Sequence, residues 1–173
     1  MGEFSNAFSQ LGKKGHLTIK QQGLEADDLA AWICGKKEEF GIDNIWLISS
    51  DRDWDLLIRE GVSRFSTVTR KEITIDNWDD HYDVEPDKYL TLKCLAGDTG
   101  DNVPGIAGIG PKRAVSLIEQ YGDLFDIYNA CPIDSKYKFI QTLNENADRL
   151  LLNAELMPTS TIGASNVSLT LKN

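Results

Sequence analysis

Three short clusters of acidic residues are the feature of this sequence that could carry chemistry. The seven carboxylates are Glu25, Asp27, Asp28, Asp51, Asp53, Asp98 and Asp101. Carboxylates that lie close together repel one another unless a cation sits among them. Because no His or Cys accompanies them, their hard oxygen ligands indicate Mg²⁺ or Mn²⁺. Two such ions suit phosphoryl transfer, since they stabilise both the attacking and the leaving oxygen. The candidate catalytic residues are Asp27, Asp51 and Asp53.

Each of the first two clusters lies at the end of an expected element. The first stands in the opening turn of a helix expected over 24–40, where the helix dipole favours carboxylates. The second follows the apolar run Ile45–Ile48, which predicts a fully buried strand. In open α/β sheets, ligands bind outside the carboxyl ends of the strands. The alternative for both clusters is that they merely cap helices.

The third cluster leads into a motif that could bind a nucleic-acid backbone. Asp98 and Asp101 are three residues apart in a Gly-rich turn, which alone is weak evidence, because such turns often contain aspartate. The sequence Gly-Ile-Gly-Pro-Lys-Arg follows, over 108–113, and predicts a helix-hairpin-helix. Its two glycines would let backbone amides approach a phosphate, and the two cations would contact neighbouring phosphates without reading sequence. The DNA-contacting candidates are Gly108, Gly110, Lys112 and Arg113. An ordinary turn between two packed helices is the alternative.

The elements that must position these residues indicate an α/β protein with a mostly parallel central sheet and an added helical subdomain. A strand over 17–20, the helix over 24–40 and the strand Ile45–Ile48 form a βαβ unit. Two β-rich runs, Val62–Val68 and Glu72–Ile75, predict an antiparallel hairpin at the sheet edge. After a helix from Pro86 to Gly97, the pattern becomes helical.

This pattern divides the chain into three parts. Residues 1–96 are expected to form part of an α/β nuclease core, and residues 97–157 a helical, duplex-binding subdomain with a helix from Pro111 to Gly122. The tail, 158–173, is expected either to return to the core as an extended segment or to be disordered.

Net charge and cysteine content narrow the class of protein. A formal charge of −9 argues against a polyanionic partner, but taking away the seven clustered carboxylates leaves −2, and two divalent ions would bring the total to +2. The sequence has no secretory leader and no apolar run of roughly 20 residues, so we expect a cytoplasmic protein without membrane contact. Its three cysteines, Cys34, Cys94 and Cys131, are expected to be buried thiols.

The order of the motifs G-x-E-A-D-D, S-S-D-R-D-W-D and G-D-T-G-D-N-V-P-G-I-A-G-I-G-P-K-R-A resembles the bacterial and bacteriophage 5′-nucleases. This family, whose core is similar to that of PIN domains, includes flap endonucleases, 5′-3′ exonucleases and the 5′-nuclease domains of DNA polymerase I. The resemblance covers about residues 15–157, and Trp54-Asp55 makes the stand-alone phage enzymes look most similar.

The resemblance implies a metal-dependent nuclease of DNA replication and repair that hydrolyses phosphodiesters near 5′ ends, in the cytoplasm of the bacterial host if a phage encodes it. It implies two or three metal ions held by the seven carboxylates, and substrates with a 5′ flap or a 5′-end duplex, RNA–DNA hybrids included. It also implies a K⁺ ion at the hairpin, near the backbone of Val103, Ile106 and Ile109.

The family's first strand, with further aspartates, and its helical arch have no match before Phe4. We therefore expect weak or no cleavage by residues 1–173 alone and a separately encoded N-terminal segment as a candidate partner. Two alternatives to a nuclease of this family remain at the level of sequence. A non-catalytic helix-hairpin-helix module would bind DNA without cleaving it, although it would not need seven carboxylates. A PIN-type ribonuclease would share the paired acids but would not explain residues 97–121.

Overall fold

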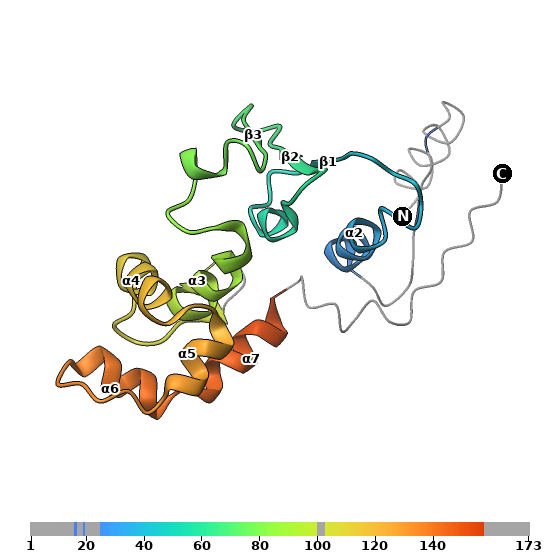
Figure 1. The fold of residues 1–173 in the computed structure, drawn as a ribbon. Coiled ribbons are helices and arrows are strands. Elements are labelled where there is room, and N and C mark those ends of the chain that lie inside the picture. The colour runs from blue at the N-terminus through green and yellow to red at the C-terminus, as the bar shows by residue number, and fades with distance from the viewer. Residues whose placement is uncertain (1–15, 17–18, 20–24, 100–102, 158–173) are drawn as a thin grey trace, which may run out of the picture.

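The computed structural model describes residues 16, 19, 25–99 and 103–157. In Figure 1, α2 and the strands β1–β3 lie on one side of α3, and the helices α4–α7 gather on its other side. This arrangement is the α/β fold with a helical subdomain that the sequence predicts. The expected strand over 17–20, Asp101 and the tail from residue 158 fall outside the described residues. No described helix is long and apolar enough to cross a membrane.

Helix α2, Ala26–Gly35, begins where predicted but ends earlier. Glu25 is its N-cap, in a capping box in which the Asp28 carboxylate accepts from the Glu25 amide at 3.4 Å. The helix was predicted to run to Phe40, but it ends at Gly35, and turns lead from there to Gly41. Glycine is a poor helix former, which accounts for the earlier end.

The sheet of the described residues has three strands in the order β1-β2-β3. β1, Ile45–Ile48, pairs in parallel with β2, Val62–Phe65, and β2 pairs antiparallel with β3, Glu72–Ile73. The predicted hairpin is therefore confirmed with shorter strands. With one parallel and one antiparallel pairing, these strands do not establish a mostly parallel central sheet.

The prediction that β1 is fully buried is wrong. Leu47 is buried against α2, but Trp46 is 50% exposed and Ile48 59% exposed. The side chains of a strand alternate between faces, and β1 is an edge strand of the described sheet. Only the face with Leu47 is therefore covered by described residues.

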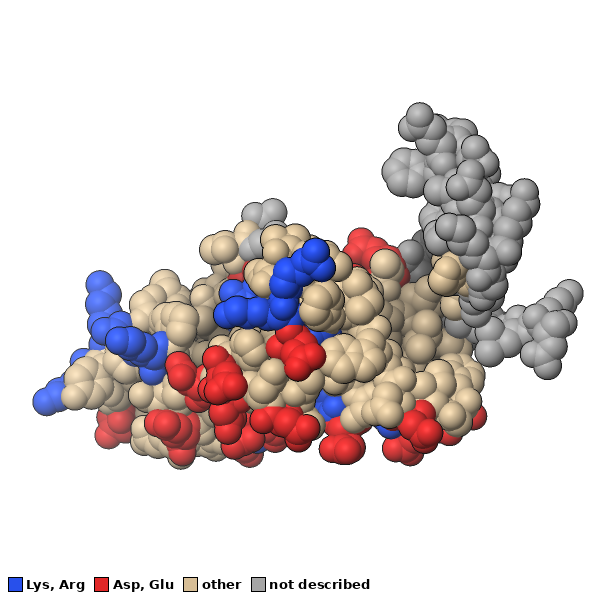
Figure 2. Space-filling model, turned by 90° about the horizontal axis from the view of Figure 1, so that it is seen from above, with Lys and Arg blue, Asp and Glu red and all other residues tan. Residues whose placement is uncertain are grey.

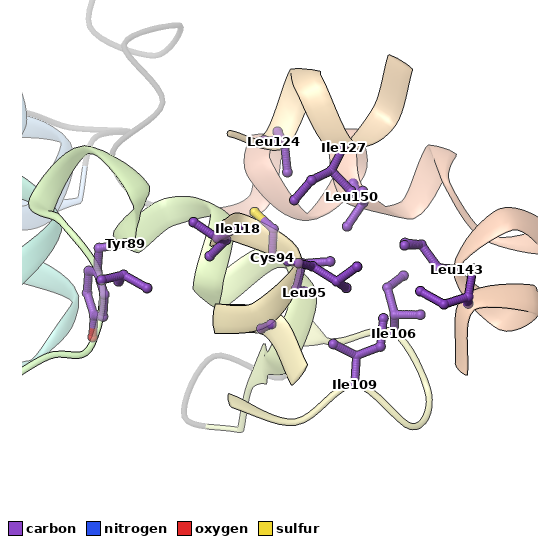
Figure 3. Packing of buried hydrophobic residues seen from close by; sticks show 14 of the residues in the cluster. Tyr89, Cys94, Leu95, Ile106, Ile109, Ile118, Leu124, Ile127, Leu143 and Leu150 are labelled. Carbon is purple, nitrogen blue, oxygen red and sulfur yellow. The ribbon is translucent and has the colours of Figure 1, made fainter. Parts of the chain in front are cut away.

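The helices pack around α3. Its bounds are Tyr89–Ala96, and the 3₁₀ turn η3, Pro86–Lys88, precedes it. The other helices are α4, Pro111–Tyr121; α5, Leu124–Ala130; α6, Lys138–Glu145; and α7, Asp148–Leu156. Figure 3 shows Leu95 of α3 among inward-pointing side chains of α4–α7 and of the hairpin before α4. As predicted, α4 starts at Pro111 and ends before Gly122. On its inner face Ala114, Leu117 and Ile118 are buried, whereas Tyr121 is half-buried.

Two glycines draw the chain together where α3 ends. Gly97 has a φ of +83°, and a Cβ built there would lie 2.3 Å from the Gly105 nitrogen. This close approach belongs to a short two-stranded ladder of β4, Gly97–Asp98, and β5, Val103–Pro104. A side chain at either glycine would push the strands apart. The ladder holds Asp98 at the end of α3, so it helps to build the site.

Candidate active site

A cleft of about 670 Å³ lies where the sheet meets the helices. Four parts of the chain line it: the loop after β1, the loop 81–83, α3 with the start of β4, and the start of α4. Its ionisable lining residues are Asp51, Arg52, Asp53, His81, Tyr82, Asp83, Tyr89, Lys93 and Asp98. Asp51 and Asp53 of the second acidic cluster and Asp98 of the third therefore line one cleft.

Lys93 joins two of these carboxylates and was missed in the sequence. Its ammonium group forms an ion pair with Asp53 and another, at 2.7 Å, with Asp98. Burial lowers the pKa of Lys93, but hydrogen bonds to the two carboxylates outweigh it, so the net shift is upward. Its position could have signalled this role, because Lys93 lies one turn after Tyr89 on an otherwise apolar helix. This spacing places the Lys93 side chain on the same inward face of α3 as Tyr89.

The loop after β1 is stabilised by its own polar groups. The Asp51 carboxylate accepts from the Asp53 amide at 3.0 Å, and the Ser49 hydroxyl accepts from the Asp51 amide at 3.1 Å. Asp53 begins the 3₁₀ helix η1, Asp53–Leu57, and is buried, whereas Asp51 is exposed. The loop thus presents one carboxylate to Lys93 and the other to solvent.

A buried ionic network lies beneath this loop. Asp55 accepts from Arg64 through both oxygens, and from the Tyr82 hydroxyl at 2.5 Å. Arg64 also donates to the Ser49 carbonyl at 2.9 Å, so it ties β2 to the start of the acidic loop. Burial, together with the hydrogen bond to Asp55, raises the pKa of Tyr82. Asp55 thus stabilises the loop from beneath and does not line the cleft.

The first acidic cluster does not line this cleft. Glu25 and Asp28 form the capping box of α2, and Glu25 borders a separate cleft of about 500 Å³ between α2 and β1. Asp27 accepts from the indole nitrogen of Trp54 at 2.6 Å, which connects α2 to η1. The alternative that these acids cap a helix therefore holds for Glu25 and Asp28 in this structure.

The hairpin before α4 has the predicted form. Gly108 has a φ of +84°, a conformation that favours glycine, and its carbonyl accepts from Arg113 at 2.6 Å. The Arg113 guanidinium also lies over the Phe139 ring, at 4.6 Å from its centroid. Gly110 is the N-cap of α4 at an ordinary φ of −90°, and a Cβ there would meet nothing within 4 Å. Gly108 is thus required by the fold, whereas Gly110 leaves open space at a helix N-terminus.

The three residues expected near a potassium ion have buried side chains. Val103, Ile106 and Ile109 are each 5% exposed or less. The Ile106 carbonyl accepts from the Ile109 amide at 2.9 Å, which closes the hairpin turn. Their side chains anchor the hairpin, so a contact with an ion would fall to their backbone carbonyls.

The donor set of the cleft fits a hard divalent ion in its chemistry. Asp51, Asp53 and Asp98 offer oxygen alone, and Asp53 and Asp98 already converge on one positive charge, that of Lys93. Within 25–99 and 103–157, no three His, Cys, Asp or Glu side chains come together as a metal-binding group. Asp101 is outside these ranges.

The surface carries both signs of charge in separate patches. Figure 2 shows Lys and Arg side chains at the end of the molecule that bears α6 and in a second patch near the middle of this face, and Asp and Glu side chains along one edge. A net charge of −9 therefore does not mean a uniformly acidic surface. Such local basic patches are what contact with a polyanion requires.

Comparison with known proteins agrees with this arrangement. Residues 84–170 match the family model described as "5′-3′ exonuclease, C-terminal SAM fold". The chain is 39% identical over 158 residues to a flap endonuclease of Escherichia phage T5, covering 90% of this chain and 54% of that protein. It is 31% identical over 165 residues to a 5′-3′ exonuclease of Halalkalibacterium halodurans, covering 92% and 54%. The chain thus spans about half the length of these relatives.

A solved structure of the phage T5 enzyme has the same fold. It is a variant of the T5 flap endonuclease in a pseudo-enzyme-product complex with DNA and metal ions. The TM-score is 0.81 at 38% identity, and the match covers 90% of this chain and 58% of that one. That protein binds DNA and metal ions on a fold that includes the one described here.

Proposed function

Because this chain belongs to the 5′-3′ exonuclease family, we propose that it takes part in metal-dependent hydrolysis of DNA phosphodiesters near a 5′ end, as an exonuclease and as a flap endonuclease. The match of the family model to 84–170 and the fold shared with the T5 enzyme support the family. The site geometry supports the chemistry.

One observation carries the proposal: the cleft with Asp53 and Asp98 is also lined by Pro111 and Val115 of α4. The N-terminus of α4 directs backbone amides and a partial positive charge outward, which suits a phosphate. A DNA backbone held there would therefore run directly past the paired carboxylates. A hairpin without an adjoining acidic cleft would bind DNA but would not cleave it.

We propose Mg²⁺ or Mn²⁺, two or three ions in all, as the metals of this site. Asp51, Asp53 and Asp98 would hold an ion in the cleft, with Asp101 joining them, and Glu25, Asp27 and Asp28 would serve a neighbouring position. Bound metal would supply a nucleophilic hydroxide at neutral pH and stabilise charge on the phosphate. Lys93 keeps Asp53 and Asp98 together, because its ammonium group pairs with both.

The hairpin is proposed to grip the duplex part of the substrate, whether DNA or an RNA–DNA hybrid. Gly110 leaves room for a phosphate at the start of α4, and Lys112 is exposed beside it. Arg113 is held by the Gly108 carbonyl and the Phe139 ring, so it offers a positioned guanidinium group. A K⁺ ion bound by the carbonyls of Val103, Ile106 and Ile109 would bridge the hairpin to a phosphate.

We also propose that a further strand completes the sheet beside β1. Trp46 and Ile48 present apolar surface, and the neighbouring cleft is lined mainly by apolar side chains of α2 and β1. An N-terminal nuclease segment, in the same polypeptide or a separate one, would suit this edge. The division at residue 97 remains a proposal too, and the packing of α3 on α4 and α7 favours placing α3 with the helical part.

Single-turnover cleavage of a 5′-flap duplex tests the function. We expect cleavage with Mg²⁺ or Mn²⁺ and none with EDTA, weak for residues 1–173 alone and stronger when the remaining segment of the T5 relative is added. Asp53→Asn should lower the rate at least about a hundredfold, since metal stabilisation is worth several kcal/mol. DNA binding should persist. The matched control is Asp79→Asn, an exposed carboxylate outside the cleft.

A second function, DNA binding without cleavage, is favoured by the pairing of Lys93. The ammonium group already offsets one of the two negative charges of Asp53 and Asp98, which reduces their repulsion when no metal is bound. If the flap duplex is bound by the completed protein but not cleaved with any divalent ion, this second function replaces the first.

A further inference from the structure

Two cations line the cleft, and among the described residues only Lys93 forms salt bridges with carboxylates. Lys93 is engaged with Asp53 and Asp98. Arg52 is exposed and takes part in none of the salt bridges found in the described part of the chain, although acids precede and follow it. A long cationic side chain at the rim of an acidic cleft, without a carboxylate partner, is available to an anion from outside.

The position of Arg52 is supported by buried groups. Its guanidinium carbon lies 5.9 Å from the centroid of the Tyr82 ring, which packs against Trp78 and Tyr89 at centroid distances of 4.4 Å each. The Tyr82 hydroxyl donates to Asp55, which the Arg64 fork holds in turn. The Tyr82 side chain also forms a hydrogen bond with Arg52. The aromatic face stabilises the guanidinium group and leaves its remaining N–H donors available to an anion.

We propose that Arg52 contacts a backbone phosphate of DNA at the mouth of the cleft and that Tyr82 is the positioning residue that orients it. The inference rests on the proposed function, since it needs DNA in this cleft. A guanidinium group matches a phosphate with two parallel hydrogen bonds. The exposed carboxylates of Asp51 and Asp83 border the same cleft, so a polyanion entering it needs a cation there.

The experiment measures binding of a 5′-flap duplex over a series of salt concentrations in EDTA, so that neither metal nor turnover enters the result. Arg52→Gln should weaken binding about tenfold and reduce the salt slope by about 0.7–0.9, the value of one lost phosphate contact. Arg52→Lys should recover the slope and part of the affinity, because it keeps the charge but not the fork. Lys36→Gln is the matched control: it removes one charge from a lysine that pairs with Glu39 and does not line the cleft.

Two substitutions at Tyr82 separate positioning from structure. Tyr82→Phe keeps the ring but loses the hydroxyl that hydrogen-bonds Arg52 and Asp55, so it should reduce the slope less than Tyr82→Leu does. Tyr82→Leu removes the ring and should reduce the slope as Arg52→Gln does, with circular dichroism confirming that each variant is folded.

An unchanged slope in folded Arg52→Gln overturns the inference while leaving the proposed function intact. A wild-type protein that does not bind the flap duplex overturns the proposed function instead. A slope that falls in Lys36→Gln as much as in Arg52→Gln would also overturn the inference, because the effect would then follow overall charge.

Discussion

The two sides of the molecule differ in the size of the buried apolar cluster that holds each of them together. The helices share one large buried cluster, which also takes in Ile58, Ile73 and Trp78 from the sheet side. The second cluster, between α2, β1 and β2, has five buried members: Ala30, Cys34, Leu47, Leu57 and Val62. Both sides keep large apolar side chains exposed within the described residues: Phe40, Trp46, Ile48, Val68 and Ile75 on the sheet side, and Phe125, Tyr137, Leu152 and Leu156 on the helical side.

The helical core stabilises the molecule, whereas both sides contribute residues to the cleft. The helical side supplies a core that can hold its elements in place, and it contributes Lys93 and Asp98 to the cleft. The sheet side contributes Asp51, Arg52 and Asp53 from a loop that buried contacts tether to β2 and Tyr82. The Lys93–Asp53 ion pair joins the two sides at the point where the proposed chemistry takes place.

The largest expected effect tests the helical core. Leu95 is completely buried at its centre, so Leu95→Ala should lower the free energy of unfolding by about 2–5 kcal/mol through lost burial and a residual cavity. Ile48→Thr removes apolar surface from a side chain that is 59% exposed and should change it by less than about 0.5 kcal/mol. Denaturant unfolding of both variants measures the contrast.

A large loss of unfolding free energy in Ile48→Thr would show that the exposed face of β1 is covered in solution. An added segment that completes the sheet should produce that same change. The pair of variants therefore also reports on the strand proposed beside β1.

The accuracy of the sequence predictions also differs between the helical side and the sheet side. Helix α4 could be placed to within a residue, because Pro111 and Gly122 mark its ends by backbone restriction. The burial of β1 could not be predicted correctly, since an apolar run does not show whether both faces of a strand will be covered. The meeting of Asp53 and Asp98 was predictable from motif order, and the structure brings both to one cleft.

The rest of the site depends on tertiary contacts that spacing does not encode. The Asp55–Arg64 pair joins residues that share no motif, and the Trp54–Asp27 hydrogen bond spans 27 positions. Lys93 was overlooked because an acidic metal site directs attention to carboxylates. Its place one turn after Tyr89 was the available signal.

The two glycines of the hairpin should give smaller and opposite effects. Gly108→Ala should cost about 1–2 kcal/mol of stability, because an alanine is strained at a φ of +84°. Gly110→Ala should leave stability unchanged or slightly higher, because its φ is ordinary and its Cβ meets open space. It should nevertheless weaken duplex binding, since that Cβ would stand where a phosphate approaches the α4 amides. Thermal unfolding and a duplex-binding titration measure the two effects, and duplex affinity unchanged in Gly110→Ala would show that the start of α4 is not the contact.

The smallest effect concerns the charge of Lys93, and it changes the unfolding free energy only at alkaline pH. The pKa of Lys93 is raised above its ordinary value of 10.5, so the folded protein retains a proton that the unfolded chain releases. The stability from this charge is fully present below pH 10.5 and is lost as the pH rises through the folded-state pKa. The loss for one proton is at most about 1.4 kcal/mol per pH unit.

Tyr82 and Tyr89, whose pKa values are also raised, titrate in the same region, so the difference between wild type and Lys93→Met isolates the lysine. We expect the unfolding free energies of the two proteins to keep a constant difference between pH 7 and about 9.5 and to converge at higher pH. A difference that shrank already near neutral pH would mean that the Lys93 pKa is lowered, as burial alone would make it, and that Asp53 and Asp98 do not hold its charge.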